Sequence, residues 1–204
     1  MNIPSRTRLA ILGTISDLHR QLLPYDLACL RQIVTEQAPD LLCAEITTAD
    51  WEQGNLAAAE LEVCEALAPV AAFTDIVLVP VAPSEKQYPE FASPTGWRQR
   101  ATPYGIRAIR WGQQQAATPE AVNGLVFGAF CHTICTLTEA TWTGAERAAW
   151  EDQNQAMAQN ILQVVRHDPG RRVLVVVQCQ RMHRLVPLLK GHAAELEVVP
   201  YQQL

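Results

Sequence analysis

The chain has 204 residues, of which 49% are hydrophobic and 18% charged, and its formal net charge at pH 7 is −5. This length predicts one domain over residues 1–204 with a sizeable core. A weakly acidic chain has no overall field that would attract nucleic acid or an anionic membrane, so neither is expected as a partner. The oligomeric state is not indicated.

Residues 9–15 form the first apolar run, which ends at Ser16 and Asp17. No run approaches the ~20 residues that a membrane-spanning helix needs. The start also lacks the small-residue cleavage site of a signal peptide. Six cysteines without a CxxC pair are typical of reduced core thiols. We therefore expect a cytoplasmic protein.

Continuous apolar runs predict strands that are covered on both faces, as in a parallel sheet. The four runs are 9–13, 40–45, 76–81 and 172–177. A fifth run, 195–201, is shorter and contains Pro200, which favours an edge strand. We predict an α/β fold with a mostly parallel sheet of about five strands and helices on both faces.

Helical spacing and capping signals predict where the helices that connect the strands begin and end. Residues 25–36 carry apolar side chains at helical spacing, and the next crossover spans about 48–69. Thr47 with Asp50, and Thr143 with Glu146, have the spacing of a capping box, which predicts helix starts at 48 and 144. The second of these helices should run to about 166. Another is expected over 182–190, where Gly191 could close it.

Residues 84–116 depart from this pattern because several prolines and glycines should break any long element. The segment is rich in arginine and aromatic residues, and no acid lies between Glu90 and Glu120. It is either a solvated excursion with arginine stems packed on aromatic rings, or a lid that presents Arg107 and Arg110 to a carboxylate or phosphate. Nucleic-acid binding is the third interpretation.

Polar residues follow three of the predicted strands. The carboxyl ends of parallel strands meet at one edge, where open α/β sheets bind their ligands, so one shared site is expected. Its candidate residues are Ser16, Asp17 and His19 after the first strand, Glu45 after the second, and Gln178 and Arg181 after the fourth.

Glu45 is the candidate general base or metal ligand, because burial at a strand end raises the pKa of a carboxyl group. The alternative is a salt bridge from Glu45 to Arg181. His19 either acts as a base or ligand, or only partners a carboxylate. Asn154 falls on the apolar stripe of the helix from 144, so it must bond either to backbone or to groups in the site.

Three common chemistries are disfavoured. Ser16, Asp17 and His19 are too close in sequence for a hydrolytic triad, which distant loops assemble. Cys131 and Cys135 share a helical face, but zinc needs four ligands and no second pair exists, so core packing is favoured. Neither GxGxxG nor GxxxxGK[ST] occurs, which argues against dinucleotide and P-loop sites. No metal ligand set and no cofactor are identified.

Three segments carry a resemblance to a known superfamily: Ile11-Leu-Gly-Thr-Ile-Ser-Asp-Leu-His19, Pro39-Asp-Leu-Leu-Cys-Ala-Glu45, and 172–185. They resemble the opening strand with its Gly-x-x-His turn, the second strand ending in Glu, and the closing strand of the superfamily that groups TraB, Tiki, erythromycin esterase and ChaN. Asn154 is similar to part of the superfamily's Arg-Asn helix motif. The resemblance implies an α/β fold with its site at the strand ends.

The resemblance also implies that both family histidines are replaced. Ser16 stands in place of the first, and Arg181 in place of the second; Gln178 replaces a glycine and Gln153 the motif arginine. Arginine has no lone pair and stays protonated, so it neither binds a metal nor shuttles protons.

We therefore expect a degenerate member of this superfamily that binds a small anionic ligand at the strand ends without conventional metal hydrolysis. One alternative is an ester or amide hydrolase with Glu45 as general base and His19 as proton shuttle. The other is a structural or partner-binding protein with Trp97 and Trp111 as interface anchors.

Overall fold

The sheet has five strands, all parallel, in the order β3-β2-β4-β1-β5. The computed structural model describes residues 6–83 and 97–204. All five predicted strands are present, which confirms the α/β fold with a parallel sheet. Their bounds are β1 Thr7–Thr14, β2 Leu41–Ala44, β3 Val77–Pro80, β4 Arg172–Gln178 and β5 Leu196–Val199.

The two longest strands lie side by side near the centre of the sheet. β1 and β4 pair over seven residues, from Arg8 with Arg172 to Thr14 with Gln178. The interior of β4 is buried throughout, as its continuous apolar run predicts. β5 lies at an edge and Pro200 follows it, so the edge prediction is confirmed.

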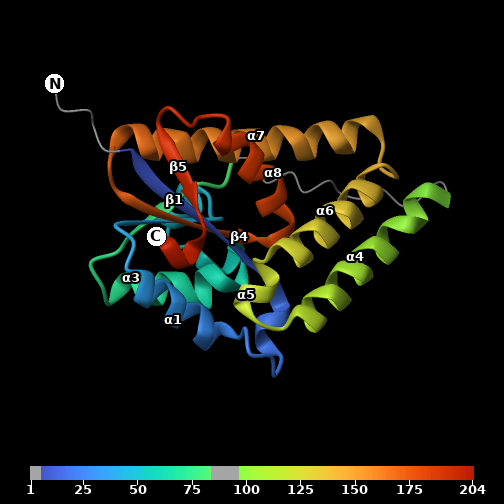
Figure 1. Ribbon diagram of the computed structural model, residues 1–204, viewed down its shortest axis with the longest axis horizontal. Helices are drawn as coiled ribbons and strands as arrows, with labels where there is room; N and C mark the ends of the chain where they lie inside the picture. The colour runs from blue at the N-terminus through green and yellow to red at the C-terminus, as the bar shows by residue number, and fades with distance from the viewer. Residues whose placement is uncertain (1–5, 84–96) are drawn as a thin grey trace.

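Helices cover both faces of the sheet. One core includes side chains of α1 (Leu27–Gln37) and η3 (Val63–Leu67), and the other includes those of α7 (Gly144–His167) and α8 (Cys179–Lys190). In Figure 1, α7 crosses one side of the sheet while α1 and α3 lie on the other. The remaining helices are η1 Ser16–Arg20, α2 Thr48–Glu52, η2 Leu56–Ala58, α3 Ala68–Ala72, α4 Trp97–Ala116, α5 Pro119–Val122, α6 Leu125–Glu139 and η4 Tyr201–Gln203.

Both predicted capping signals start a helix. At α7 the capping box is complete, because the Thr143 hydroxyl accepts from the backbone N–H of Glu146 and the Glu146 carboxylate accepts from that of Thr143. At α2 the Thr47 hydroxyl accepts from the Asp50 N–H, but the carboxylate accepts from the Thr47 hydroxyl instead. The crossover that follows is not one helix: α2 ends at Glu52, and three short helical pieces complete it.

The prediction that proline and glycine break any long element in 84–116 was wrong for its second half, where α4 is a helix of 20 residues. Two of its glycines serve close packing against α6. A Cβ on Gly105 would lie 2.0 Å from Thr138 Oγ1, and one on Gly112 would lie 2.4 Å from Phe130 Cε1. Glycine therefore marks helix contact here rather than a chain break. Residues 84–96 of the predicted lid lie outside the described part.

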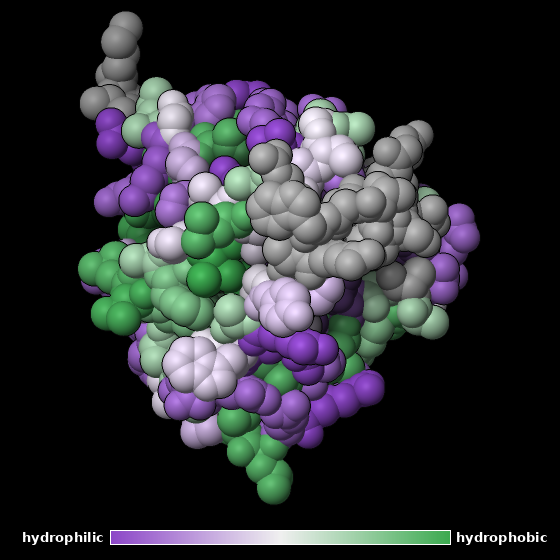
Figure 2. All heavy atoms as spheres, turned by 90° about the vertical axis from the view of Figure 1, so that its right-hand side faces the viewer, coloured by the Kyte–Doolittle hydropathy of each residue, from purple (hydrophilic) through white to green (hydrophobic). Residues whose placement is uncertain are grey.

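Several large hydrophobic side chains are exposed on the α4 and α6 helices, including Trp111 at 60%. The others there are Tyr104, Ile106, Leu125, Val126 and Leu137. Figure 2 shows that hydrophobic and hydrophilic side chains are mixed on the face that it presents. Within residues 6–83 and 97–204, no helix combines the length and apolar character that crossing a membrane requires.

Candidate functional site

The candidate site lies at the carboxyl ends of neighbouring strands whose following helices pack on opposite faces of the sheet. β1 leads to α1, and β2 leads to η3, both in the first core, whereas β4 leads to α8, which contributes to the second. β4 lies between β1 and β2. Connections from neighbouring strands to opposite faces create a crevice at the strand ends, which is the usual ligand position in open α/β sheets.

A buried ion pair occupies the centre of this crevice. Arg181 Nε lies 2.5 Å from Glu45 Oε1, and both residues are 3% exposed. The structure therefore shows the salt bridge that was one of the two interpretations of Glu45. Burial raises the pKa of Glu45, and the adjacent Arg181 charge opposes that shift.

Three residues of α7 surround the guanidinium of Arg181. Its terminal nitrogens donate to Asn154 Oδ1 and Gln153 Oε1, each at 3.3 Å. Its central carbon lies 4.4 Å from the ring centroid of Trp150, within cation–π range. Asn154 satisfies both sequence interpretations, since its amide also donates to the Trp150 carbonyl at 2.7 Å.

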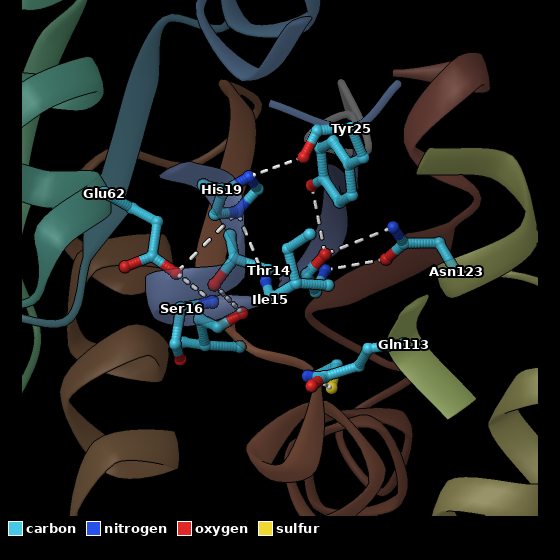
Figure 3. A network of polar contacts seen from close by, with 11 residues as sticks. Thr14, Ile15, Ser16, His19, Tyr25, Glu62, Gln113 and Asn123 are labelled. Carbon is cyan, nitrogen blue, oxygen red and sulfur yellow. Dashed lines mark hydrogen bonds and ion pairs between the residues drawn. The ribbon is translucent and has the colours of Figure 1, made fainter. Parts of the chain in front are cut away.

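His19 lies at the end of β1 with both ring nitrogens bonded to backbone (Figure 3). Its Nε2 accepts from the Ile15 N–H at 3.2 Å, which leaves Nδ1 to donate to the Tyr25 carbonyl at 2.8 Å. Burial lowers the pKa of His19, so the neutral ring is favoured. A proton shuttle at this position would have to break one of these bonds.

Glu62 is a central residue of this region that sequence reasoning missed. Its Oε1 accepts from the Ser16 N–H at 2.9 Å and lies 3.8 Å from His19 Nε2 (Figure 3). Ser16 has a left-handed backbone, with φ of 54°, which this contact helps to hold. Burial raises the pKa of Glu62. The sequence held little signal, because Glu62 is one of three glutamates in this stretch, with Glu60 and Glu65.

Asn123 is a second residue without a sequence prediction. Its Oδ1 accepts from the Gly13 N–H at 2.6 Å, and its Nδ2 donates to the Gly13 carbonyl at 3.2 Å. The Tyr25 hydroxyl donates to the same carbonyl at 3.0 Å (Figure 3). A Cβ on Gly13 would lie 3.1 Å from the backbone of Cys179. These contacts fix the end of β1 against α5 and α8.

The ends of β1, β2 and β4 meet around a cavity of about 10 Å³, which Thr14, Glu45, Glu62 and Gln178 help to line. This is about the space of one water molecule. The Oε2 atoms of Glu45 and Glu62 have no hydrogen-bond partner among the described residues. Sequence reasoning placed Ser16, Glu45, Gln178 and Arg181 together, and the structure brings their segments into contact here.

Asp17 and Arg110 are exposed and bond to each other, with two N–O distances of 2.8 and 2.9 Å. Arg107 lies over the ring of Tyr104, 6.0 Å from its centroid. The two candidate lid arginines therefore contact an acid and an aromatic ring of this chain, and neither makes a described contact with the Glu45–Arg181 pair.

Two larger pockets open on the other side of Arg181, and Trp150 and Glu139 line both. The first, which we call the charged pocket, has a volume of about 340 Å³. The second, the aromatic pocket, has about 210 Å³. The charged pocket is also lined by Arg147, Glu151, Asn154, Gln155, Arg184, Pro187 and Leu188, and the aromatic pocket by Ile106, Ile109, Cys135, Thr138, Trp142 and Gln180.

Comparison of the chain with family models, curated proteins and solved structures found no match. Within residues 6–83 and 97–204, no three His, Cys, Asp or Glu residues converge as a metal-binding group. The geometry therefore supplies the argument for function.

Proposed function

We propose that this protein binds a small anionic ligand in the charged pocket, beside the Glu45–Arg181 pair, without conventional metal hydrolysis. The observation that supports this proposal is the position of the pocket. It lies between α7 and α8, shares Asn154 and Trp150 with the surroundings of Arg181, and has the size of a small-molecule site.

The charged residues of the pocket are two acids, Glu139 and Glu151, and two arginines, so the case for an anion depends on Arg147. Arg147 is exposed and makes no ion pair with any residue in the described ranges. Arg184 is paired with Glu139. A carboxylate or phosphate in the pocket would gain bidentate contacts from Arg147, and the Asn154–Arg181 layer would form a rigid floor.

The strand-end groups themselves support binding over hydrolysis. Glu45 Oε1 faces Arg181, which is a permanent cation and stabilises the ionised carboxylate. His19 uses both ring nitrogens within the fold. His19 cannot exchange a proton without loss of one of these bonds, and a proton on Glu45 would remove the negative charge that pairs with Arg181.

Isothermal titration of the full chain with citrate, benzoate, phosphate and pyrophosphate tests this proposal. We expect at least one of these anions to bind, and Arg147→Gln to weaken that binding about tenfold, equivalent to about 1.4 kcal/mol. Arg171→Gln is the matched control, because Arg171 is an exposed arginine beside Asp40 at the other end of the sheet. The proposal fails if no anion binds, or if both variants bind as well as wild type.

A hydrolase is the second candidate, favoured by one observation. Glu45 and Glu62 border a cavity the size of one water molecule, and each has an Oε2 without a partner in the described chain. A carboxylate beside a water is what general-base hydrolysis requires. In this alternative Glu45 activates the water and His19 moves the proton.

A screen with ester and amide substrates distinguishes the candidates. The hydrolase alternative requires turnover by wild type that Glu45→Gln abolishes, with the variant still folded by circular dichroism. Asp17→Asn is the control, since Asp17 is an exposed surface acid. Absence of turnover in the wild type contradicts this alternative and leaves the binding proposal to the titration.

A further inference from the structure

A cluster of cysteines lies behind the aromatic pocket, outside the proposed anion site. Cys131 and Cys135 are one turn apart on α6, with their sulfurs 3.9 Å apart. Cys131 is fully buried, whereas Cys135 is partly exposed and lines the pocket. On α8, Cys179 accepts a hydrogen bond from the Gln113 amide at 3.1 Å. Of these three, Cys135 lines the aromatic pocket, whereas Cys131 and Cys179 have no exposed surface.

The surroundings of Cys135 favour its thiolate. The Cys131 and Cys135 sulfurs are in contact, and either thiol could be the donor. This contact and the charge of Arg184 lower the pKa of Cys135 against the effect of burial. The same contact raises the pKa of Cys131, which therefore keeps its proton. A thiolate that is supported by a donor and a nearby cation is the nucleophilic form of cysteine.

The pocket in front of Cys135 has a definite chemical character. Trp142, Trp150, Ile106 and Ile109 make it mainly aromatic and aliphatic, and its volume of about 210 Å³ suits a ring-sized group. This lining favours an uncharged ligand that carries a ring.

We propose that Cys135 is a covalent modification site and that the aromatic pocket takes an apolar, ring-bearing α,β-unsaturated carbonyl compound. The Cys135 sulfur forms a bond to the β-carbon of the ligand, and the C=C π bond breaks. Its electron pair moves to the carbonyl oxygen as an enolate. The α-carbon then takes a proton from water. Overall, S–H adds across the double bond, so no oxidant or reductant is required.

This site differs from the charged pocket in residues and in ligand, although Trp150 and Glu139 border both. The charged pocket would hold an anion by arginine contacts, whereas the aromatic pocket would hold an uncharged ring and bond it to sulfur. Each proposal can therefore fail without the other.

The test is competitive labelling of the native full chain at pH 7 with substoichiometric N-phenylmaleimide, followed by peptide mapping. Cys29 and Cys64 are the internal references, because both are partly exposed like Cys135. We expect Cys135 to react at least tenfold faster than either. Equal or slower labelling of Cys135 overturns the proposal.

Two matched variants test the role of Cys131. Cys131→Ser keeps a hydrogen-bond donor and should retain fast labelling, whereas Cys131→Val has a similar volume without a donor and should slow Cys135 several-fold. Equal rates in the two variants contradict the activation by Cys131. Far-ultraviolet circular dichroism establishes that both variants are folded.

The preference for an apolar ring is tested with two reagents. N-phenylmaleimide should label Cys135 faster than N-methylmaleimide after both rates are divided by those for a free cysteine peptide. Cys135→Ser should lose the fast reaction. Trp142→Ala should reduce the preference for the phenyl reagent, because it removes one wall of the pocket. A preference that is absent in wild type contradicts the assigned ligand class.

Discussion

The two sides of the strand-end crevice differ in how far the protein satisfies its own polar groups. On the β1 side, His19 bonds to backbone at both ring nitrogens and Glu62 accepts from the Ser16 N–H, and the cavity that Glu62 lines there is only about 10 Å³. On the α7 side, pockets of about 340 and 210 Å³ open beyond Arg181. The polar strand ends alone would have suggested one open site. The position of a crevice in the fold therefore does not determine whether its cavity is large enough for a ligand.

The largest expected effect on the free energy of unfolding comes from breaking the Glu45–Arg181 pair, which lies between these two sides. Arg181→Met leaves the buried Glu45 carboxylate without its cation, which should cost about 3–5 kcal/mol of unfolding free energy. Urea denaturation followed by circular dichroism measures this loss. The double variant with Glu45→Met should recover much of it, because no unpaired charge remains. A loss below about 1 kcal/mol in the single variant would contradict the central role of the pair.

The next largest effect on stability is expected from a substitution that disturbs the close packing of α4 on α6. Gly105→Ala should destabilise the protein by about 1–3 kcal/mol, because its Cβ would overlap Thr138 Oγ1, which already donates to the Ile134 carbonyl. Gly144→Ala is the control, since nothing lies within 4 Å of its Cβ position. Thermal denaturation compares the two. If Gly105→Ala is as stable as the control, the close-contact explanation of α4 is wrong.

His183 should make the contact between α6 and α8 sensitive to acid. Burial and the nearby His132 lower its pKa from 6.5 to about 4. Because the folded pKa is the lower one, the neutral ring stabilises the fold above pH 6.5, and this stabilisation is lost as the pH falls toward 4. With partial exposure allowed for, we expect a loss of about 1–2 kcal/mol. Unfolding of wild type and His183→Phe at pH 7 and pH 4.5 measures it, and equal losses would contradict the assignment.

The smallest effect concerns the surface pair that holds one candidate lid arginine. Asp17→Asn should change the unfolding free energy by less than about 1 kcal/mol, because both partners are exposed. It also frees Arg110, so anion binding measured by titration should strengthen slightly if α4 acts as a lid. An unchanged affinity would place Arg110 outside the binding region and sharpen the contrast between the two sides.

The strands of the sheet could be predicted from the sequence, because a strand that is buried on both faces has a continuous run of apolar residues. The sequence also located Glu45 and Arg181, since both follow such runs. Whether those charges remain open or pair with each other depends on helix packing that brings residues 136 positions apart into contact. No local pattern encodes that distance.

Other features were hidden for different physical reasons. Gly105 and Gly112 match the local pattern of a broken chain, and only the neighbouring α6 explains them as packing contacts. Glu62 matches a solvated helix position until burial against β1 is known. Trp150 follows an ordinary helical stripe, and its contact with Arg181 requires α8 in place. Tertiary contacts, not local preferences, determined each of these cases.

The most direct test of the central claim is a map of backbone amide shifts, measured by nuclear magnetic resonance while an anion identified by titration is added. If the ligand binds on the α7 side, the largest shifts should occur at Arg147, Trp150, Asn154 and Arg184, with little change at Thr14, Ser16 and Glu62. The largest shifts at Thr14, Ser16 and Glu62 would contradict the account and place the ligand on the β1 side.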